Sequence, residues 1–470
     1  MDVLKQITNP YLPSWEYIPD GEPYIFGDRL YVYGSHDKFN GDVYCMGDYV
    51  CWSADVNDLG TWRYEGVIYQ KSDDPANTDL QGNLYAPDVT VGPDGRYYLY
   101  YVLSNVGFVS VAVCDEPAGK YEFYGYVHYE DGTRLGEGED DEAQFDPGVI
   151  TEGDNTYMYT GYCPLTDTSR HGAMCTVLGP DMLTVRKAPV FIVPATHNSK
   201  GTQYEDHAFF EAPSIRKKDG LYYFIYSSQV CRELCYATSE RPDGDFTYRG
   251  VLVDNGDIGI TSYKRADMPG CYCANNHGSM INIGRDWYIF YHRHTNGTNY
   301  SRQGCFEKLA ADGDICFRQA ELTSCGSTPF TEKGFYPAYL ACNLFTKDEE
   351  LSIPWRGWMD DRFPKITQEG RDGDEVNGYV CNMRDTATAG FKYFVCDGTR
   401  VVSVRTKGYA TGALEVRTVP GGKCLGSFPI SFANVWHDVT GSVNIPDGTN
   451  SLFFTFSGEG HLQFSGFELA

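Results

Sequence analysis

The sequence has little positive charge and lacks any long hydrophobic run. Lysine and arginine together number 38, against 64 aspartates and glutamates, which gives a formal net charge of −26. A surface this acidic repels phosphate backbones and anionic lipids, so we expect neither nucleic acid nor a membrane surface as a partner. No run of about 18 apolar residues occurs, so a helix that spans a bilayer is excluded.

A secretory signal is also missing. The opening sequence MDVLKQITNPYLPSWEY has no basic segment followed by an apolar stretch. The 16 cysteines are scattered through 470 residues instead of being concentrated in a small domain. Without a signal, this pattern predicts mostly reduced thiols and a cytoplasmic protein.

Helical periodicity is scarce. We find no sustained pattern of apolar residues at i, i+3, i+4 and i+7. Instead, 15% of the residues are aromatic, with 37 tyrosines and 26 phenylalanines, beside 51 glycines. Aromatic residues favour strands, and glycine marks turns. Short alternating runs such as RYYLYYV and LYYFIYS therefore predict an all-β protein.

Five of these aromatic runs share one pattern, in which an ionisable residue precedes a short strand, a turn and the aromatic strand. The ionisable residues lie 58 to 68 residues apart and are Asp20, Asp88, Asp146, Glu211 and His277. Five similar units of this length indicate a repeat architecture. Four-stranded units repeated around an axis make a β-propeller, so we predict a five-bladed β-propeller over residues 1–330.

The end of the chain lacks this repeat. A segment rich in Gly, Pro and Thr follows Cys325 and indicates a domain boundary. Beyond it, alternating segments such as FKYFVC, ALEVRTV and SLFFTFS are separated by the turn sequences CDGT, PGGK and PDGTN. This spacing predicts a second domain, a β-sandwich, over residues 342–470.

The repeat has a chemical consequence, because the innermost strand of a propeller blade tends to begin near the central axis. Two carboxyl groups that face a glycosidic bond are the minimum machinery for its hydrolysis, provided that the acid has a raised pKa. Glu211 lies in the aromatic sequence DHAFFEAPSI, which favours its desolvation, whereas Asp20 lies in a turn. Each carboxylate taken alone is equally explained as a turn former, since Asp and Glu are common before Pro.

These motifs resemble those of glycoside hydrolase family 43, five-bladed propellers that hydrolyse arabinose- and xylose-containing glycans with inversion. The resemblance rests on DGEPYIFGDRLYVYGSHD, YAPDV and EAPSIRKKDGLYYFIYS and covers most of the predicted propeller. It implies Asp20 as the general base, Glu211 as the general acid, and Asp88 as the residue that orients the acid and raises its pKa. Gly21 stands where the family usually has Pro, and the register with IFGDRLYVY favours Asp20 over Glu22.

The implied reaction is a single displacement. Asp20 would deprotonate a water that attacks the anomeric carbon while Glu211 protonates the leaving oxygen. In inverting glycosidases the two carboxyl groups lie about 6.5–9.5 Å apart. We expect an exo-acting enzyme that releases α-L-arabinofuranose or β-D-xylose from pentose-containing oligosaccharides of hemicellulose. The alternatives are an endo-acting arabinanase or xylanase, and a non-catalytic sugar-binding propeller, although a lectin has no use for a poised acid.

The resemblance also implies further site residues. Many family members hold a calcium ion on the propeller axis with one His ligand, which corresponds to His277; the alternative is a His bonded to backbone at a strand start. Histidine is an unusual ligand for calcium, which prefers oxygen. Arg293 is similar to an arginine that contacts the sugar near the acid. Phe210 and Tyr85 lie next to the motifs and are candidates for stacking on a pentose ring.

Two cysteine spacings, Cys231–Cys235 and Cys271–Cys273, admit a zinc interpretation. Structural zinc normally uses paired ligands in two C-x₂₋₄-C units, and the C-x-C half fits that pattern poorly.

The second domain resembles a carbohydrate-binding module of family 6, through segments such as ITQEGRDGDE and VRTKGYATGALEVRT. Such modules often bind a structural calcium through two Glu near the start and an Asp near the end. Here Glu369 matches, whereas Thr367 and Gln463 stand at the other two positions. Trp436 is either an exposed platform for a sugar ring or part of the core.

Overall fold

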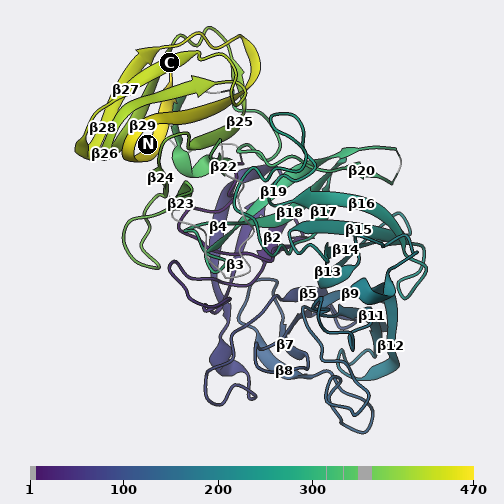
Figure 1. Ribbon diagram of the computed structural model, residues 1–470. Helices are drawn as coiled ribbons and strands as arrows, with labels where there is room; N and C mark the ends of the chain where they lie inside the picture. Colours follow the sequence, from purple (N-terminus) through teal and green to yellow (C-terminus); the bar gives the residue numbers. More distant parts are fainter. Residues whose placement is uncertain (1–6, 314, 332, 348–361) are drawn as a thin grey trace.

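The computed structural model describes residues 7–313, 315–331, 333–347 and 362–470 (Figure 1). Within these ranges the regular elements are strands, apart from three short 3-10 helices, and no helix has the length and apolar character needed to cross a bilayer. The all-β prediction is confirmed. Residues 1–6, on which part of the expectation about a secretory signal depends, lie outside the described residues. The 3-10 helices are η1 (Lys71–Asp73), η2 (Thr196–Asn198) and η3 (Ala338–Leu340).

The predicted five-bladed propeller is confirmed: five separate four-stranded antiparallel sheets follow one another along the chain. The first blade consists of β1 (Glu22–Phe26), β2 (Arg29–Tyr33), β3 (Tyr49–Asp55) and β4 (Asp58–Tyr69). The second consists of β5 (Asp88–Val91), β6 (Tyr97–Tyr101), β7 (Ser110–Cys114) and β8 (Glu122–Tyr126). The third consists of β9 (Gly148–Glu152), β10 (Asn155–Thr160), β11 (Gly172–Leu178) and β12 (Val185–Pro194). The fourth consists of β13 (Phe209–Lys218), β14 (Leu221–Ser228), β15 (Glu233–Ser239) and β16 (Thr247–Asp254). The fifth consists of β17 (Met280–Ile283), β18 (Asp286–His294), β19 (Arg302–Ala311) and β20 (Phe317–Arg318).

The high aromatic content is explained by the two buried faces of each blade. In β6, Tyr98 and Tyr100 belong to the apolar cluster shared with the third blade, while Leu99 and Tyr101 belong to the cluster shared with the first. Successive side chains of a strand point to opposite faces, so a strand between two neighbouring blades buries all its residues. Large rings fill the wedge between radiating sheets, and a buried tyrosine can also use its hydroxyl group: that of Tyr100 donates to the Met182 carbonyl.

The propeller is closed by the N-terminal segment that precedes the first blade. The side chain of Asn9 donates to the carbonyls of Phe306 and Thr323 and to the carboxylate of Glu307, at 2.8 to 2.9 Å. Its backbone N–H donates to the Ser324 carbonyl. Residues that precede the first blade therefore hold the last blade in the ring.

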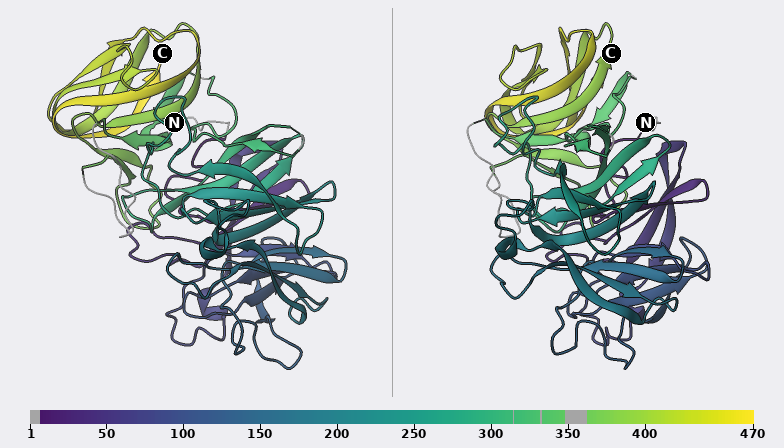
Figure 2. Two further views of the ribbon diagram at one scale, coloured as in Figure 1. Left: turned by 45° about the vertical axis from the view of Figure 1, so that its right-hand side comes forward. Right: turned by 90° about the vertical axis from the view of Figure 1, so that its right-hand side faces the viewer.

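The C-terminal domain is a nine-stranded sheet that curves back on itself into a nearly closed, sandwich-like unit beside the propeller, and it confirms the predicted fold class (Figure 2). The long strands β26 and β29 pair along most of their length. β21 also pairs with β29, so the sheet already includes residues before position 342. The strands are β21 (Gly334–Pro337), β22 (Asn343–Phe345), β23 (Lys365–Thr367), β24 (Tyr379–Met383), β25 (Thr388–Cys396), β26 (Val401–Arg417), β27 (Gly426–Ile430), β28 (Ala433–Ser442) and β29 (Gly448–Leu469).

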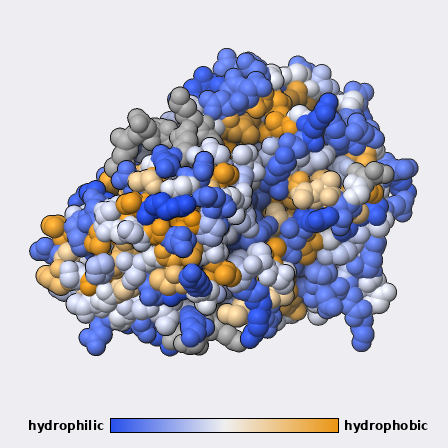
Figure 3. Space-filling view, turned by 90° about the horizontal axis from the view of Figure 1, so that it is seen from above, coloured by the Kyte–Doolittle hydropathy of each residue, from blue (hydrophilic) through white to orange (hydrophobic). Residues whose placement is uncertain are grey.

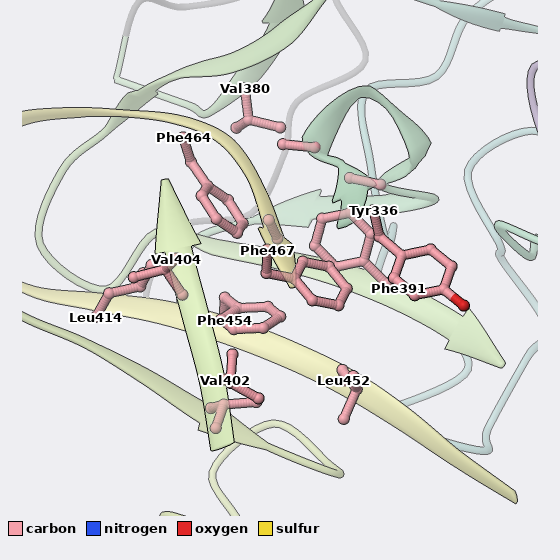
Figure 4. Close-up of a cluster of buried hydrophobic side chains, with 14 of the residues drawn as sticks. Tyr336, Val380, Phe391, Val402, Val404, Leu414, Leu452, Phe454, Phe464 and Phe467 are labelled. Carbon is pink, nitrogen blue, oxygen red and sulfur yellow. The ribbon is translucent and has the colours of Figure 1, made fainter. Parts of the chain in front are cut away.

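Phenylalanine dominates the core of this domain. Figure 4 shows Phe391, Phe454, Phe464 and Phe467 in mutual contact, with the Phe454 and Phe467 ring centroids 4.7 Å apart. Tyr336 of β21 stacks on Phe467 at 5.7 Å, which ties the segment after the propeller into the core. On the face seen in Figure 3, hydrophobic residues form separate groups among hydrophilic ones.

The two domains are joined by buried polar contacts. The hydroxyl of Tyr17 donates to the Gln368 side chain at 2.6 Å. The ammonium group of Lys392, on β25, lies 2.8 Å from Glu321 and 3.3 Å from Asp257, which belong to the propeller. Because these groups are paired across the boundary, the second domain completes the hydrogen bonding of the first.

Candidate active site

A cavity of about 430 Å³ lies where the innermost strands of the blades begin. Its lining includes four of the five residues that mark the repeats, namely Asp20, Asp146, Glu211 and His277. Asp20 and Asp146 each lie two residues before the first strand of their blade, and Glu211 is the third residue of β13. The repeat thus brings ionisable groups from four blades into one space.

Asp20 is held in an unusual backbone conformation, with φ of +58°. Its backbone N–H donates to Nδ1 of His292, and Nε2 of His292 donates to the Asn275 carbonyl at 2.7 Å. Nη1 of Arg302 donates to the carboxylate of Asp20 at 3.0 Å. Burial acts to raise the pKa of Asp20, but the Arg302 guanidinium, His292 and His277 together outweigh it, and the pKa is held well below its ordinary value. Asp20 is therefore a carboxylate at neutral pH.

Glu211 has the opposite electrostatic environment. Burial, and next the charge of Asp146, raise its pKa to about 8. Glu211 is therefore protonated at neutral pH and can donate its proton. Two carboxyl groups of one cavity whose pKa values are displaced in opposite directions form an acid and base pair.

Asp146 and His277 form the third charged group of the cavity. Nδ1 of His277 lies 3.5 Å from Oδ2 of Asp146. Burial lowers the pKa of His277, but Asp146, together with Asp20 and Glu22, outweighs this effect and raises the pKa to about 9. Burial raises the pKa of Asp146, while His277 opposes the shift. We assigned Asp146 no role from the sequence, although it lies two residues before the first strand of its blade, as Asp20 does.

The structure corrects the predicted role of Asp88. This residue is the first of β5 and is fully buried, and Ala86, two residues earlier, takes the place at the cavity wall. The carboxylate of Asp88 accepts hydrogen bonds from the Tyr24 hydroxyl and the Val149 N–H, both at 2.7 Å. Asp88 therefore does not line the cavity, and the charge that contributes most to raising the pKa of Glu211 is that of Asp146.

The two aromatic residues predicted to contact sugar both line the cavity. Tyr85 and Phe210 are part of a continuous row of rings with Phe145 and Tyr162 between them. Neighbouring ring centroids in this row are 5.1 to 5.7 Å apart. Such a wall offers apolar faces to the C–H groups of a sugar ring, beside the carboxyl groups that would act on its anomeric carbon.

Arg293 does not reach the cavity, contrary to the prediction. Its guanidinium donates to the Gln303 side chain and to the carbonyls of Tyr339 and Ala341, so it serves the contact between the domains. Alternation explains the error, because His292 and His294 point to one side of β18 and Arg293 to the other.

The arginine of the cavity is Arg302, the first residue of β19. It binds Asp37 through two parallel hydrogen bonds of 2.8 and 3.0 Å, lies 4.8 Å above the Tyr44 ring, and extends a third nitrogen to Asp20. Sequence reasoning gave Arg302, Asp37 and His292 no role in this site. Asp37 ends the motif DGEPYIFGDRLYVYGSHD and His292 lies in the fifth aromatic run, but no sequence pattern links either of them to Arg302. Only the cavity shows that they meet.

His277 was predicted to bind calcium, and its surroundings can be tested for that role. Its Nε2 lies 3.9 Å from Oε1 of Glu22, a buried oxygen with no hydrogen-bond partner. Once the imidazole has given up its proton, its nitrogen and an unpartnered carboxylate oxygen that face one space fit a divalent cation whose other ligands are waters.

The residues of the possible second calcium site differ in their partners. The hydroxyl of Thr367 donates to Asn296, the carboxylate of Glu369 pairs with Lys407, and Gln463 has a buried side-chain oxygen without a partner. Trp436 is half-buried between Tyr379 and the Lys407 ammonium group, so it does not present a free platform for sugar.

Comparison with known sequences agrees with the cavity chemistry. The family model described as glycosyl hydrolases family 43 matches residues 16–314. A protein named xylosidase/arabinosidase from Thermoclostridium stercorarium is 60% identical over 468 residues, which span 99% of each chain. An arabinoxylan arabinofuranohydrolase from Bacillus subtilis is 24% identical over 93% of this chain and 86% of its own.

Solved structures share the fold. A family 43 arabinoxylan arabinofuranohydrolase from Bacillus subtilis, in complex with cellotetraose, aligns over 99% of this chain and 97% of its own, with a TM-score of 0.53 and 20% identity. A β-xylosidase/α-arabinofuranosidase from a compost microbial metagenome, in complex with xylotriose and in a calcium-free form, aligns over 67% of this chain and 98% of its own. That alignment has a TM-score of 0.52 and 24% identity.

Proposed function

Since the chain belongs to glycoside hydrolase family 43 and is a glycoside hydrolase, we propose that it is an inverting exo-glycosidase that releases α-L-arabinofuranose or β-D-xylose from hemicellulose fragments. One observation carries the assignment of roles: Asp20 and Glu211 share a cavity, and their pKa values are displaced in opposite directions. The cavity volume of about 430 Å³ is in the lower half of the range for small-ligand sites, which favours a short substrate.

In the proposed reaction, the ionised carboxylate of Asp20 takes a proton from a water. The water oxygen bonds to the anomeric carbon as the bond from that carbon to the leaving oxygen breaks. Glu211 gives its proton to the leaving oxygen, and the sugar is released with inverted configuration. Asp146 keeps Glu211 protonated through its charge, which is the role that the sequence had suggested for Asp88.

The experiment compares Glu211→Gln with the wild type on aryl β-D-xyloside, aryl α-L-arabinofuranoside and xylobiose. We expect kcat to fall by about 10² to 10⁴ on xylobiose, whose leaving oxygen needs a proton, and by less on the aryl glycosides. The exposed Glu240→Gln is the matched control and should leave all rates unchanged.

The wild-type products and rates test the rest of the proposal. Proton NMR of the first-formed sugar should show the anomer opposite to that of the substrate. Turnover of polymer without turnover of the short substrates would mean an endo-acting enzyme, and binding without any turnover would mean a lectin. Either result would overturn the exo-acting assignment.

We further propose that a hydrated calcium ion is held by His277 and Glu22 on the propeller axis. Bound there, it would supply positive charge beside the buried carboxyl groups. Dialysis against a chelator should lower the unfolding temperature, and added calcium, but not sodium, should restore it. An unchanged unfolding temperature in both steps would contradict a calcium site.

A further inference from the structure

A second group of metal-binding residue types lies outside the cavity, at the beginning of the fourth blade. His207 precedes β13, and Glu233 and Cys235 lie on the same side of β15. One ligand atom from each of these three residues lies within 4.8 Å of the other two. The mechanism proposed above uses none of them.

The distances within the group are close to those of a zinc site. Cys235 Sγ is 3.6 Å from Glu233 Oε1 and 3.8 Å from His207 Nδ1. Tetrahedral zinc with bonds of about 2.0 to 2.3 Å separates its ligand atoms by roughly 3.3 to 3.8 Å. The remaining pair, His207 Nδ1 and Glu233 Oε1, is at the hydrogen-bond distance of 2.7 Å and has to widen when a metal replaces the proton.

The side chains around the group fix the ligands. The Ser228 hydroxyl donates to Glu233 at 2.5 Å, and the Tyr248 ring stacks on the His207 imidazole at 5.1 Å with an interplanar angle of 17°. Cys235 is fully buried, whereas the His207 side chain is 33% exposed. The group is therefore supported from behind and open to solvent at the imidazole, which gives an ion an entry path and a water ligand.

We propose that His207, Glu233 and Cys235 form a binding site for a thiophilic divalent cation, zinc, with water as the fourth ligand. Thiolate and imidazole select zinc over calcium or magnesium, which prefer oxygen. As the metal–sulfur and metal–nitrogen bonds form, the thiol proton and the proton between His207 and Glu233 pass to solvent. Cys235 thus combines with its strand neighbour Glu233 and with the distant His207, and not with Cys231, which lines the active-site cavity.

The site would act as a cross-link. His207 lies four residues before Glu211, and Glu233 lies two residues after Cys231, another residue of the cavity wall. A metal bound to both segments would fix the loop that enters β13 against the start of β15. Because it would bind only the folded chain, zinc should raise the unfolding temperature.

Cobalt substitution tests the proposal without relying on activity. The full-length reduced protein, freed of metal, is titrated with Co²⁺ and followed by absorption. We expect an intense visible band of tetrahedral cobalt and a near-ultraviolet thiolate-to-cobalt band, both complete at a single metal ion per chain. Addition of Zn²⁺ should abolish both bands and raise the unfolding temperature.

Three variants locate the site. Cys235→Ser should lose the thiolate band, and His207→Gln, at a partly exposed position, should lose the stoichiometric binding and the thermal shift. Cys424→Ser removes an exposed thiol of the other domain and should behave as the wild type. The proposal is overturned if the wild type shows no thiolate band, or if that band survives in both Cys235→Ser and His207→Gln.

Discussion

At the scale of single residues, the protonation states of the two carboxyl groups in the cavity depend on charged residues that are distant from them in the sequence. Asp20 is ionised because Arg302, distant in the sequence, lies against it, and Glu211 is protonated because burial and Asp146 oppose its charge. Asp37 binds Arg302 through two hydrogen bonds and so keeps the guanidinium aimed at Asp20. The protonation states that hydrolysis requires are thus fixed before substrate enters.

The pH dependence follows from the raised pKa of Glu211. As the acid, Glu211 acts while protonated, so kcat/KM should be maintained below its pKa of about 8 and fall as the pH rises through that value. Asp146→Asn removes a charge that raises this pKa, so the basic limb of the profile should move to lower pH.

Asp88→Asn is the comparison for this prediction, because Asp88 is buried outside the cavity and the charge that contributes most to raising the pKa of Glu211 is that of Asp146. Its basic limb should coincide with that of the wild type when kcat/KM is measured on an aryl xyloside. A basic limb displaced by Asp88→Asn and not by Asp146→Asn would restore the role that the sequence motif suggested for Asp88.

At the scale of elements, strand β25 places the ammonium group of Lys392 in a fully buried position between the domains. Lys392 lies between Asp257 and Glu321. Burial lowers its pKa, but Asp257, Cys342 and Glu321 together outweigh burial, so the pKa stays above its ordinary value. The Asp257 carboxylate also accepts from Tyr263 and Asn343. Removal of one partner of such a buried ion pair is strongly destabilising, because the other charge is left uncompensated.

Lys392→Met should therefore lower the free energy of unfolding by about 3–5 kcal/mol. Lys308→Met is the matched control: its ion pair with Asp286 has the same 2.8 Å distance as that of Lys392 with Glu321, but both of its side chains are over 40% exposed. That variant should lose less than about 1 kcal/mol. Urea unfolding of both measures the difference, and similar losses would contradict the role assigned to Lys392.

The elements also show what the sequence can and cannot predict. Alternating aromatic runs predict the strands, because a blade buries both faces and tolerates few polar residues. The register at the axis was harder to predict. The motif APDV aligns Asp88 with Asp20, yet the strand begins at Asp88 itself and two residues after Asp20. A shift of two residues keeps a side chain on the same face but moves it one step along the axis, out of the cavity.

At the scale of the whole molecule, the two domains share their polar interior. Arg293 and Lys392 each join the propeller to the C-terminal domain through buried contacts. The sequence patterns distinguished a repeating propeller from a following sandwich, but they contained no local pattern for the contacts between the two. Such contacts join residues far apart in the sequence, so composition and periodicity do not report them.

A chain that ends at residue 330 should therefore fold poorly. It leaves Asp257 without Lys392 and Arg293 without two backbone carbonyls, and each buried group without a partner costs about 1–3 kcal/mol. We expect low soluble yield and a lower unfolding temperature by circular dichroism than for the full chain expressed in parallel. Equal unfolding temperatures and equal kcat would contradict this dependence on the second domain.

Because Asn9 contacts Ser324, the propeller ring cannot close until both residues have been synthesised. A ribosome adds about 5–20 residues per second, so roughly 15 to 60 s separate the emergence of these two residues. During this interval the first blades exist as an open arc, with an exposed apolar face at each end. The arc is a natural client for chaperones, and the first and last parts of the chain can join only when translation of the propeller is complete.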